Sequence, residues 1–345
     1  MFTAYVDDVI IKQKAQRRFD MNHIYSNWHL GVTFGFRAKN GWFSTEEAKA
    51  EARAIKESGA DWVVLVVTVY QEHTYSVRQF KDFVMTPSDF EVMEIIDYLH
   101  SLGLKVQLRP MLETLDGSGR LGVWFPNDDP AGNRIPGLVR TELSDWFQSM
   151  TERAVYYARI AEKTGAEIYC LDSELDYLVS YSDRWKNLLE KVRAVYSGPV
   201  TSCHTTHTGI IDYEKTLSDK NHWFYDLDFL SLSCYHSADR LGLTKEERKE
   251  DFLPQLHRFR RIAEIYEKPI LFGEFGSNLP PEQQADYLSM FIEMFEGEPW
   301  WYGVYWWKWD EQVDRPFGDR WWPIKGRPAE KVYKEWSRAD RSRTL

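Results

Sequence analysis

Short apolar runs alternate with amphipathic stretches along this chain from residue 31 to its end. Residues 61–70 (DWVVLVVTVY) form a continuous run rich in β-branched side chains, which is typical of a parallel strand buried on both faces. Residues 45–58 instead predict an amphipathic helix, with Thr45 or Ser44 as its N-cap. The repeated alternation of these two patterns predicts parallel strands connected by crossover helices.

Eight strands and roughly eight helices are predicted in this way. The strands are expected at residues 31–36, 61–70, 104–111, 166–172, 199–204, 228–235, 269–275 and 302–309. The helices are expected at residues 45–58, 88–102, 141–164, 182–196, 249–267, 281–295 and 328–337. Residues 112–139, rich in Gly, Pro and Asp, predict a long loop of the kind that shapes a substrate cleft in barrel enzymes, and residues 205–227 predict an irregular loop.

Eight strand–helix units favour a closed (β/α)8 (TIM) barrel of class α/β over a doubly wound sheet, which usually has five or six strands. A doubly wound sheet also often carries a Gly-rich phosphate turn after its first strand. The segment GVTFGFRAKNG lacks the GxGxxG spacing, and no GxxxxGK[ST] motif occurs. We therefore expect one catalytic barrel domain over residues 1–345, with residues 1–30 as an extension that caps the barrel.

Composition narrows the choice of partners. The 43 Lys and Arg against 53 Asp and Glu give a formal net charge of −10, which argues against nucleic acid or an anionic membrane as partner. No apolar stretch approaches the ~20 residues of a membrane helix, and the N-terminus lacks a secretory h-region, so a cytoplasmic location is expected. The high aromatic content, with 15 Trp and 19 Tyr, suits a protein in which some rings stack on sugars. Three widely spaced cysteines predict buried, inert thiols.

The chemistry of such a barrel lies where its strands end. Two glutamates each follow an apolar strand, Glu174 in YCLDSEL on the fourth strand and Glu274 in ILFGEFG on the seventh. A buried carboxylate must be paired, hydrogen-bonded or shifted in pKa, so either residue alone can be a structural ion pair. Because the fourth and seventh strands face each other, the two together predict the carboxylate pair that glycoside hydrolysis needs.

The sequence resembles the clan of retaining glycosidases that carry the acid/base on strand four and the nucleophile on strand seven. Within it, the chain looks most similar to glycoside hydrolase family 113, typified by β-1,4-mannanases. The resemblance spans about residues 31–310, through TVYQEHTYS, YYARIAEKTGAEIYCLDSELDYL, DLDFLSLSCYHS, KPILFGEFGS and GVYWWKW. It implies a retaining hydrolase of mannan or manno-oligosaccharides that needs no cofactor.

The same resemblance assigns roles to individual residues. Glu174 would be the acid/base, Glu274 the nucleophile and Tyr235 the tyrosine whose hydroxyl orients the nucleophile. Trp307 or Trp309 would be the platform beneath the attacked sugar. Ser173 stands where the wider clan usually has an asparagine that contacts the sugar 2-hydroxyl.

The same comparison with the clan marks a departure at the residue before Ser173. Family 113 tends to have Gly then Thr before its acid/base, whereas this chain has Asp172 and Ser173. The extra carboxylate of Asp172 is expected to raise the pKa of Glu174. These departures leave the retaining mechanism in place but keep a xylan or glucan substrate open.

The remaining polar strand-end residues carry weaker predictions. Tyr70 is a candidate for substrate contact. Arg109 is a candidate for binding substrate or pairing with the nucleophile, with a structural ion pair as the alternative. His204 is a candidate for binding sugar hydroxyls, with a structural strand-end histidine as the alternative. His204, His207 and His236 together also suggest a metal-dependent hydrolase as an alternative. The first strand lacks the HxH motif of amidohydrolases, so no metal is expected. A non-catalytic carbohydrate-binding barrel is the other alternative.

Overall fold

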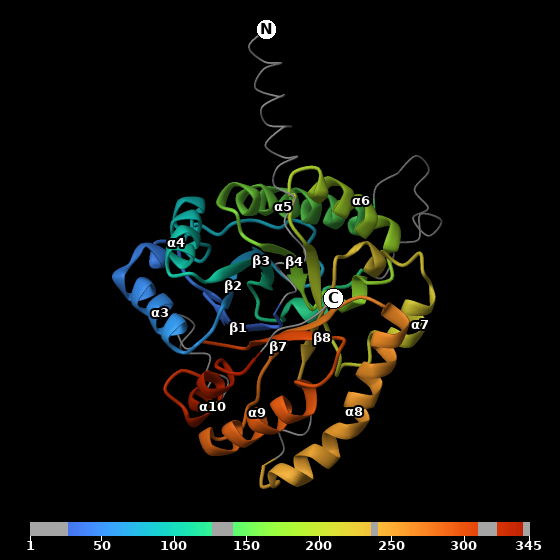
Figure 1. Cartoon of the computed structure of the whole chain (residues 1–345). Coiled ribbons are helices and arrows are strands. Elements are labelled where there is room, and N and C mark those ends of the chain that lie inside the picture. The colour runs from blue at the N-terminus through green and yellow to red at the C-terminus, as the bar shows by residue number, and fades with distance from the viewer. Residues whose placement is uncertain (1–26, 126–140, 236–240, 310–322, 341–345) are drawn as a thin grey trace.

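The structure is a computed structural model that describes residues 27–125, 141–235, 241–309 and 323–340. Within them, eight parallel strands pair in sequence order and close on themselves through β1 and β8. Helices surround this barrel in the order of the chain, so the colour runs once around the ring (Figure 1). The predicted (β/α)8 fold is therefore confirmed.

The strands lie close to their predicted positions. Their bounds are β1 His29–Phe34, β2 Trp62–Gln71, β3 Lys105–Thr114, β4 Ile168–Ser173, β5 Val200–Thr205, β6 Leu230–Cys234, β7 Ile270–Phe275 and β8 Trp301–Trp306. Strand β8 ends at Trp306, before its expected end at residue 309, whereas β3 continues to Thr114 because all ten of its residues pair with β2. Part of the segment that was expected to be a loop from residue 112 is therefore strand.

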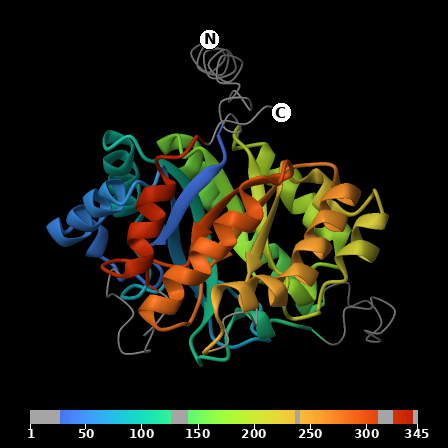
Figure 2. The same cartoon turned by 60° about the horizontal axis from the view of Figure 1, so that its bottom comes forward.

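The helices lie outside the strands when the barrel is viewed from the side (Figure 2). Their bounds are α3 Glu46–Glu57, α4 Asp89–Ser101, α5 Glu142–Thr164, α6 Ser182–Arg193, α7 Tyr213–Ser218, α8 Lys245–Tyr266, α9 Pro281–Phe295 and α10 Pro328–Trp336. Helix α8 begins at Lys245, four residues before its expected start at residue 249. Thr244 and Glu247 form a capping box that starts the helix at Lys245.

The prediction of an irregular loop over residues 205–227 was wrong. This segment contains the short helix α7 and a 3-10 helix at Trp223–Asp226. The side chain of Asp212 accepts a hydrogen bond from the backbone N–H of Lys215, and that of His222 caps the 3-10 helix in the same way. Both elements are short, so they lack the several turns of apolar spacing that reveal a helix in a sequence.

Strand β2 shows how the core is divided between two layers. Val63, Leu65 and Val67 face outward into the large core between barrel and helices. Trp62, Val64 and Val66 alternate with them and face the barrel interior. The strand is therefore buried on both faces, as its β-branched run predicts.

The start of the barrel lies within the segment that was expected to cap it. Residues 1–26 lie outside the described part of the chain, but His29 and Leu30 already belong to β1. Trp28 packs against Trp301 and Trp336 with ring centroids 5.3 and 4.5 Å apart. In the described part, the barrel thus begins two residues earlier than predicted.

The three cysteines are buried and form no disulfide, as predicted. No helix in the described ranges is both long and apolar enough to span a membrane.

Candidate active site

Glu274 lies on β7 near the C-terminal end of the barrel, and its carboxylate is almost completely buried. Oε1 accepts hydrogen bonds from Arg109 Nη1 at 2.8 Å and from Ser173 Oγ at 2.6 Å. Oε2 accepts one from the hydroxyl of Tyr235 at 3.3 Å. Three donors from three different strands or strand ends thus hold this carboxylate in one orientation, and one of them carries a full positive charge.

The fully buried Arg109 is kept in place by the backbone beside Glu274. Its Nη2 donates to the carbonyl oxygen of Gly273 at 3.0 Å. A Cβ at Gly273 would lie 2.0 Å from Ser231 Oγ and 3.1 Å from Arg109 Nη2, so only glycine fits there. Of the two roles expected for Arg109, the geometry favours pairing with Glu274 over direct contact with substrate.

Glu174 reaches the same space because β4 is irregular. Cys170 pairs with Thr201 and Ser173 with Cys203, so three steps along β4 match two steps along β5. Such a bulge changes the alternation of side chains, and here Cys170 and Ser173 both face inward. Glu174 follows directly with φ 62°, and its N–H donates to the carbonyl of Cys203 at 2.8 Å.

A left-handed backbone at a glutamate is uncommon and costs roughly 1 kcal/mol or more, so the surrounding contacts must impose it. Those contacts involve both carboxylate oxygens of Glu174. Oε1 accepts from Ser233 Oγ at 2.6 Å, and Oε2 accepts from Arg120 Nη2 at 2.8 Å. Only 7% of the residue is exposed.

The surroundings of Glu174 raise its pKa to about 7. Burial is the main cause because it disfavours the charged form. The charges of Glu274 and Asp176 raise the pKa further, while Arg120 and the hydrogen bond from Ser233 lower it. Near neutral pH this carboxyl group can therefore both give and take a proton.

Asp172, two positions before Glu174, was expected to raise this pKa but has another role. It forms an ion pair with Arg153 on α5 and accepts hydrogen bonds from the N–H groups of Leu112 and Ser173 at 3.2 and 2.7 Å. Asp172 is thus neutralised by Arg153. Asp176 is the neighbouring aspartate that acts on Glu174 instead.

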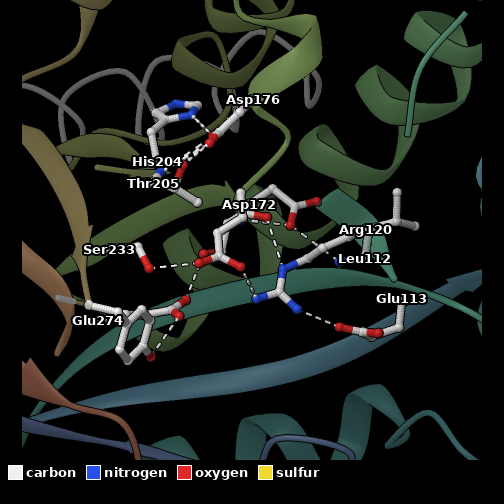
Figure 3. A network of polar contacts seen from close by, with 12 residues as sticks. Leu112, Glu113, Arg120, Asp172, Asp176, His204, Thr205, Ser233 and Glu274 are labelled. Carbon is white, nitrogen blue, oxygen red and sulfur yellow. Dashed lines mark hydrogen bonds and ion pairs between the residues drawn. The ribbon is translucent and has the colours of Figure 1, made fainter. Parts of the chain in front are cut away.

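Asp176 belongs to a second buried cluster, together with His204 and Thr205 (Figure 3). His204 Nδ1 lies 3.2 Å from its Oδ1, and the hydroxyl of Thr205 donates to its Oδ2. The ring of His204 packs against Trp223 and Phe224 and is fully buried. This environment favours the structural alternative for His204 over contact with a sugar hydroxyl.

The two candidate tryptophans after β8 differ in position. Trp309 is buried, and its indole N–H donates to Glu51 of α3 at 2.8 Å, which turns it toward the outer helices. Trp307 remains partly exposed and packs against Phe36 with ring centroids 4.8 Å apart. The geometry therefore favours Trp307 as the platform residue.

Tyr70 lies at the end of β2, opposite Glu113 in the register with β3. Burial raises its pKa to about 12, and the charges of Arg37 and Glu113 act on it as well. This places Tyr70 among the charged groups at the C-terminal end of the barrel. It is 6% exposed.

Sequence reasoning missed two residues that contact Glu174. Arg120 lies in the segment predicted as loop, where no periodic pattern points to its direction. Ser233 had a signal, because Leu230 and Leu232 face outward in β6, and the two serines that alternate with them, Ser231 and Ser233, must face inward. Serines repeated inside an otherwise apolar strand indicate that their hydroxyls form hydrogen bonds with polar groups inside the barrel.

The described residues contain no group of three or more His, Cys, Asp or Glu side chains arranged to hold a metal ion. His236, one of the histidines considered for a metal site, lies outside the described ranges. His207 packs edge-on against Tyr235 with ring centroids 5.9 Å apart. The site therefore contains two carboxylates with different partners: Glu274 pairs with the buried Arg109, and Glu174, whose pKa is raised to about 7, pairs with Arg120.

Comparison with known proteins identifies one matching family and several similar structures. The model of glycoside hydrolase family 113 matches residues 32–317. The structure is similar to that of a family 113 β-1,4-mannanase, with 26% identity, a TM-score of 0.73, and coverage of 91% of this chain and 100% of the other. It is also similar to a family 113 β-mannanase from Alicyclobacillus acidocaldarius, with 27% identity, a TM-score of 0.73, and coverage of 90% and 97%.

More distant matches share the fold alone. A family 5 protein from Bifidobacterium longum aligns with 14% identity and a TM-score of 0.61, over 92% of this chain and 81% of the other. No curated protein sequence matches the chain significantly.

Proposed function

The chain belongs to glycoside hydrolase family 113, and from this premise we propose that it cleaves β-1,4-mannosidic linkages in mannan or manno-oligosaccharides with retention of configuration. Its similarity to a β-1,4-mannanase and to a β-mannanase, over nearly the whole length of each, supports the substrate. The observation that carries the mechanism is the contrast between its two buried glutamates: Glu274 is held by three donors, Arg109, Ser173 and Tyr235, whereas burial raises the pKa of Glu174 to about 7.

In the first step, Glu274 attacks the anomeric carbon and forms a covalent glycosyl-enzyme. The donors Arg109, Ser173 and Tyr235 fix the orientation of the attacking carboxylate. Glu174 gives its proton to the departing glycosidic oxygen, which leaves as a hydroxyl group. Partly exposed Trp307 offers an apolar face to the sugar ring under attack.

In the second step, Glu174 is ionised and removes a proton from water. The water attacks the anomeric carbon from the side that the leaving group vacated, and Glu274 is released as a carboxylate. A carboxyl pKa near the working pH suits both halves of this exchange, because the group must be acid once and base once. Two inversions at one carbon retain its configuration.

The first experiment is hydrolysis of β-linked manno-, xylo- and gluco-oligosaccharides by the wild type and the E174A variant, with products separated by size. Cleavage of the manno series that is lost in E174A supports the whole proposal. Cleavage of the xylo or gluco series keeps the mechanism and replaces the substrate. No cleavage of any series contradicts the proposal and favours a barrel that binds carbohydrate without catalysis.

The stereochemistry needs its own measurement. Proton NMR of the first product formed distinguishes the anomers before they equilibrate. A retaining enzyme, with its carboxyl groups ~5–5.5 Å apart, releases the β-anomer. Initial release of the α-anomer would rule out the double displacement and point to an inverting pair.

A further inference from the structure

Arg120 lies in a short 3-10 helix, Arg120–Gly122, just beyond β3, and its guanidinium is fully engaged at the site. Nη1 donates to Glu113 Oε1 at 2.5 Å, Nη2 to Glu174 Oε2 at 2.8 Å, and Nε to the carbonyl of Ser173 at 3.1 Å. Figure 3 shows the Arg120 guanidinium reaching toward Glu113 on one side. Only 12% of the side chain is exposed, so these pairs are little screened by solvent.

The two arginines of the site divide their charge differently. Arg109 binds one carboxylate, Glu274, and otherwise a carbonyl oxygen. Arg120 binds two carboxylates at once, those of Glu174 and Glu113. Glu113 is only 4% exposed. Glu113 has a second, longer contact with Arg37 at 3.5 Å.

We propose that Arg120 is a positioning residue for Glu174, and that Glu113 tunes it by taking up part of its charge. This inference rests on the proposed function, because it concerns the residue that gives and takes the proton. Arg120 fixes the Oε2 side of the carboxyl group while Ser233 holds Oε1. Glu113 then determines how strongly Arg120 favours the ionised form of Glu174.

A shared arginine differs from two simpler arrangements, an arginine bound to Glu174 alone and no arginine at all. An arginine facing Glu174 without Glu113 would hold the carboxylate ionised, and the proton needed in the first step would be absent. Without the arginine, the carboxylate formed after proton transfer would be buried with a hydroxyl as its remaining donor. A shared arginine avoids both extremes, because it stabilises the newly formed carboxylate without removing the proton beforehand.

Removing Arg120 and removing Glu113 should therefore shift the pKa of Glu174 in opposite directions. In R120Q, the basic limb of the kcat/KM profile should move up by about one pH unit, because a positive charge beside the carboxylate is lost. In E113Q, it should move down by about one unit, because Arg120 then acts on Glu174 alone. A residue that only supports the loop would lower activity without moving the limb.

Three further variants serve as controls. The E113Q/R120Q double variant removes the pair as a unit, so its basic limb should return toward the wild-type position. R120K keeps the charge but loses the fork that joins two carboxylates, so its limb should lie between those of the wild type and R120Q. R261Q removes an arginine from a half-exposed surface pair with Glu214 and should leave the profile unchanged.

A second measurement separates this inference from the proposed function. The titration of Glu174 can be followed by carbon NMR of protein labelled at the glutamate carboxyls, with E174Q to assign the resonance. Opposite shifts in R120Q and E113Q support the inference even if no tested glycan is cleaved. Equal titration of Glu174 in wild type and both variants overturns it even if mannan hydrolysis is established. If R120Q fails to fold, E113Q and the double variant still decide.

Discussion

At the N-terminal end of the barrel, the interior is filled by Trp62, Ile168, Leu271 and Tyr302, each the first or second residue of its strand. His29 completes this layer by stacking on Trp62 at 4.1 Å and lying 2.8 Å from the hydroxyl of Tyr305. At the C-terminal end, the inward side chains are instead carboxylates, guanidinium groups and hydroxyls. The interior side chains are buried at both ends, but they are mostly apolar at the N-terminal end and polar or charged at the C-terminal end.

The difference shows which end stabilises the protein and which end performs its reaction. Apolar burial at the N-terminal end gives free energy of folding directly. Each buried charge at the other end costs desolvation energy that its partner only partly returns. One closed sheet carries both the apolar layer and the charged site, because its strands hold each charged group within hydrogen-bonding distance of its partner. Substitutions at the two ends should therefore separate stability from activity.

The largest effect is expected from replacing the proposed nucleophile. E274A should lower kcat by on the order of 10⁴-fold or more, because no covalent intermediate can form. It should also lower the melting temperature, because Arg109 stays buried without its carboxylate. Steady-state kinetics and thermal melts check both effects.

The matched control for E274A is E298A. It removes another glutamate that pairs with an arginine, Arg260, but in the segment that leads into β8. Activity per folded molecule should stay at the wild-type level. Near-normal kcat in E274A, or a comparable loss in E298A, would contradict the division between the two ends.

At the apolar end, W62A should lower the free energy of unfolding by about 3 kcal/mol, because a large side chain is removed from a close-packed layer. Its kcat, measured well below the melting temperature, should remain near that of the wild type. Chemical denaturation and kinetics on the same preparation test this. A large loss of kcat in fully folded W62A would mean that this layer also controls the geometry of the site.

The pH profile tests the charged end without mutation. The surroundings of Glu174 raise its pKa from the ordinary value of 4.5 to about 7, so the protonated donor disappears above that pH. We expect kcat/KM to fall about tenfold per pH unit on the basic side of pH 7. In the E174Q variant, the residual activity should lack this limb. A limb that persists in E174Q would assign the titration to another group.

The smallest effect is expected from S173A. The serine contributes one of three hydrogen bonds to the Glu274 carboxylate, so its loss should lower kcat/KM about tenfold. Arg109 and Tyr235 still hold the carboxylate, and the fold should be unaffected. A loss as large as that of E274A would show that Ser173 does more than orient Glu274.

The sequence predicted the barrel well because its strands and most helices carry strong local patterns. The run at residues 61–70 became β2, and the order of eight units set the closed topology. Helix α7 escaped because it has only six residues. At the site, Glu174 and Glu274 were predictable because a charge after an apolar strand stands out. Arg120 was not, because a cation in an irregular segment has no pattern that reveals its partner.

The partner of Asp172 also escaped sequence reasoning. Its neighbour Glu174 suggested a repulsive pair, but the carboxylate turns toward Arg153 on the outer helix. The reason is the irregularity of β4, which cannot be seen in a six-residue strand with period-two alternation alone. Local spacing predicts which residues share a face only as long as the strand remains regular.

The bulge in β4 therefore acts as a phase shift in the strand. Two side chains an odd number of positions apart, Cys170 and Ser173, enter the same interior, while the one before Ser173 leaves it. Without the bulge, a regular β4 of the same sequence would exchange the two neighbours, with Asp172 inside the barrel and Ser173 outside it. A hydroxyl donor would leave Glu274, and the carboxylate of Asp172 would take its place. The distinction between a stabilised nucleophile and a repelled one thus depends on one extra residue in the strand.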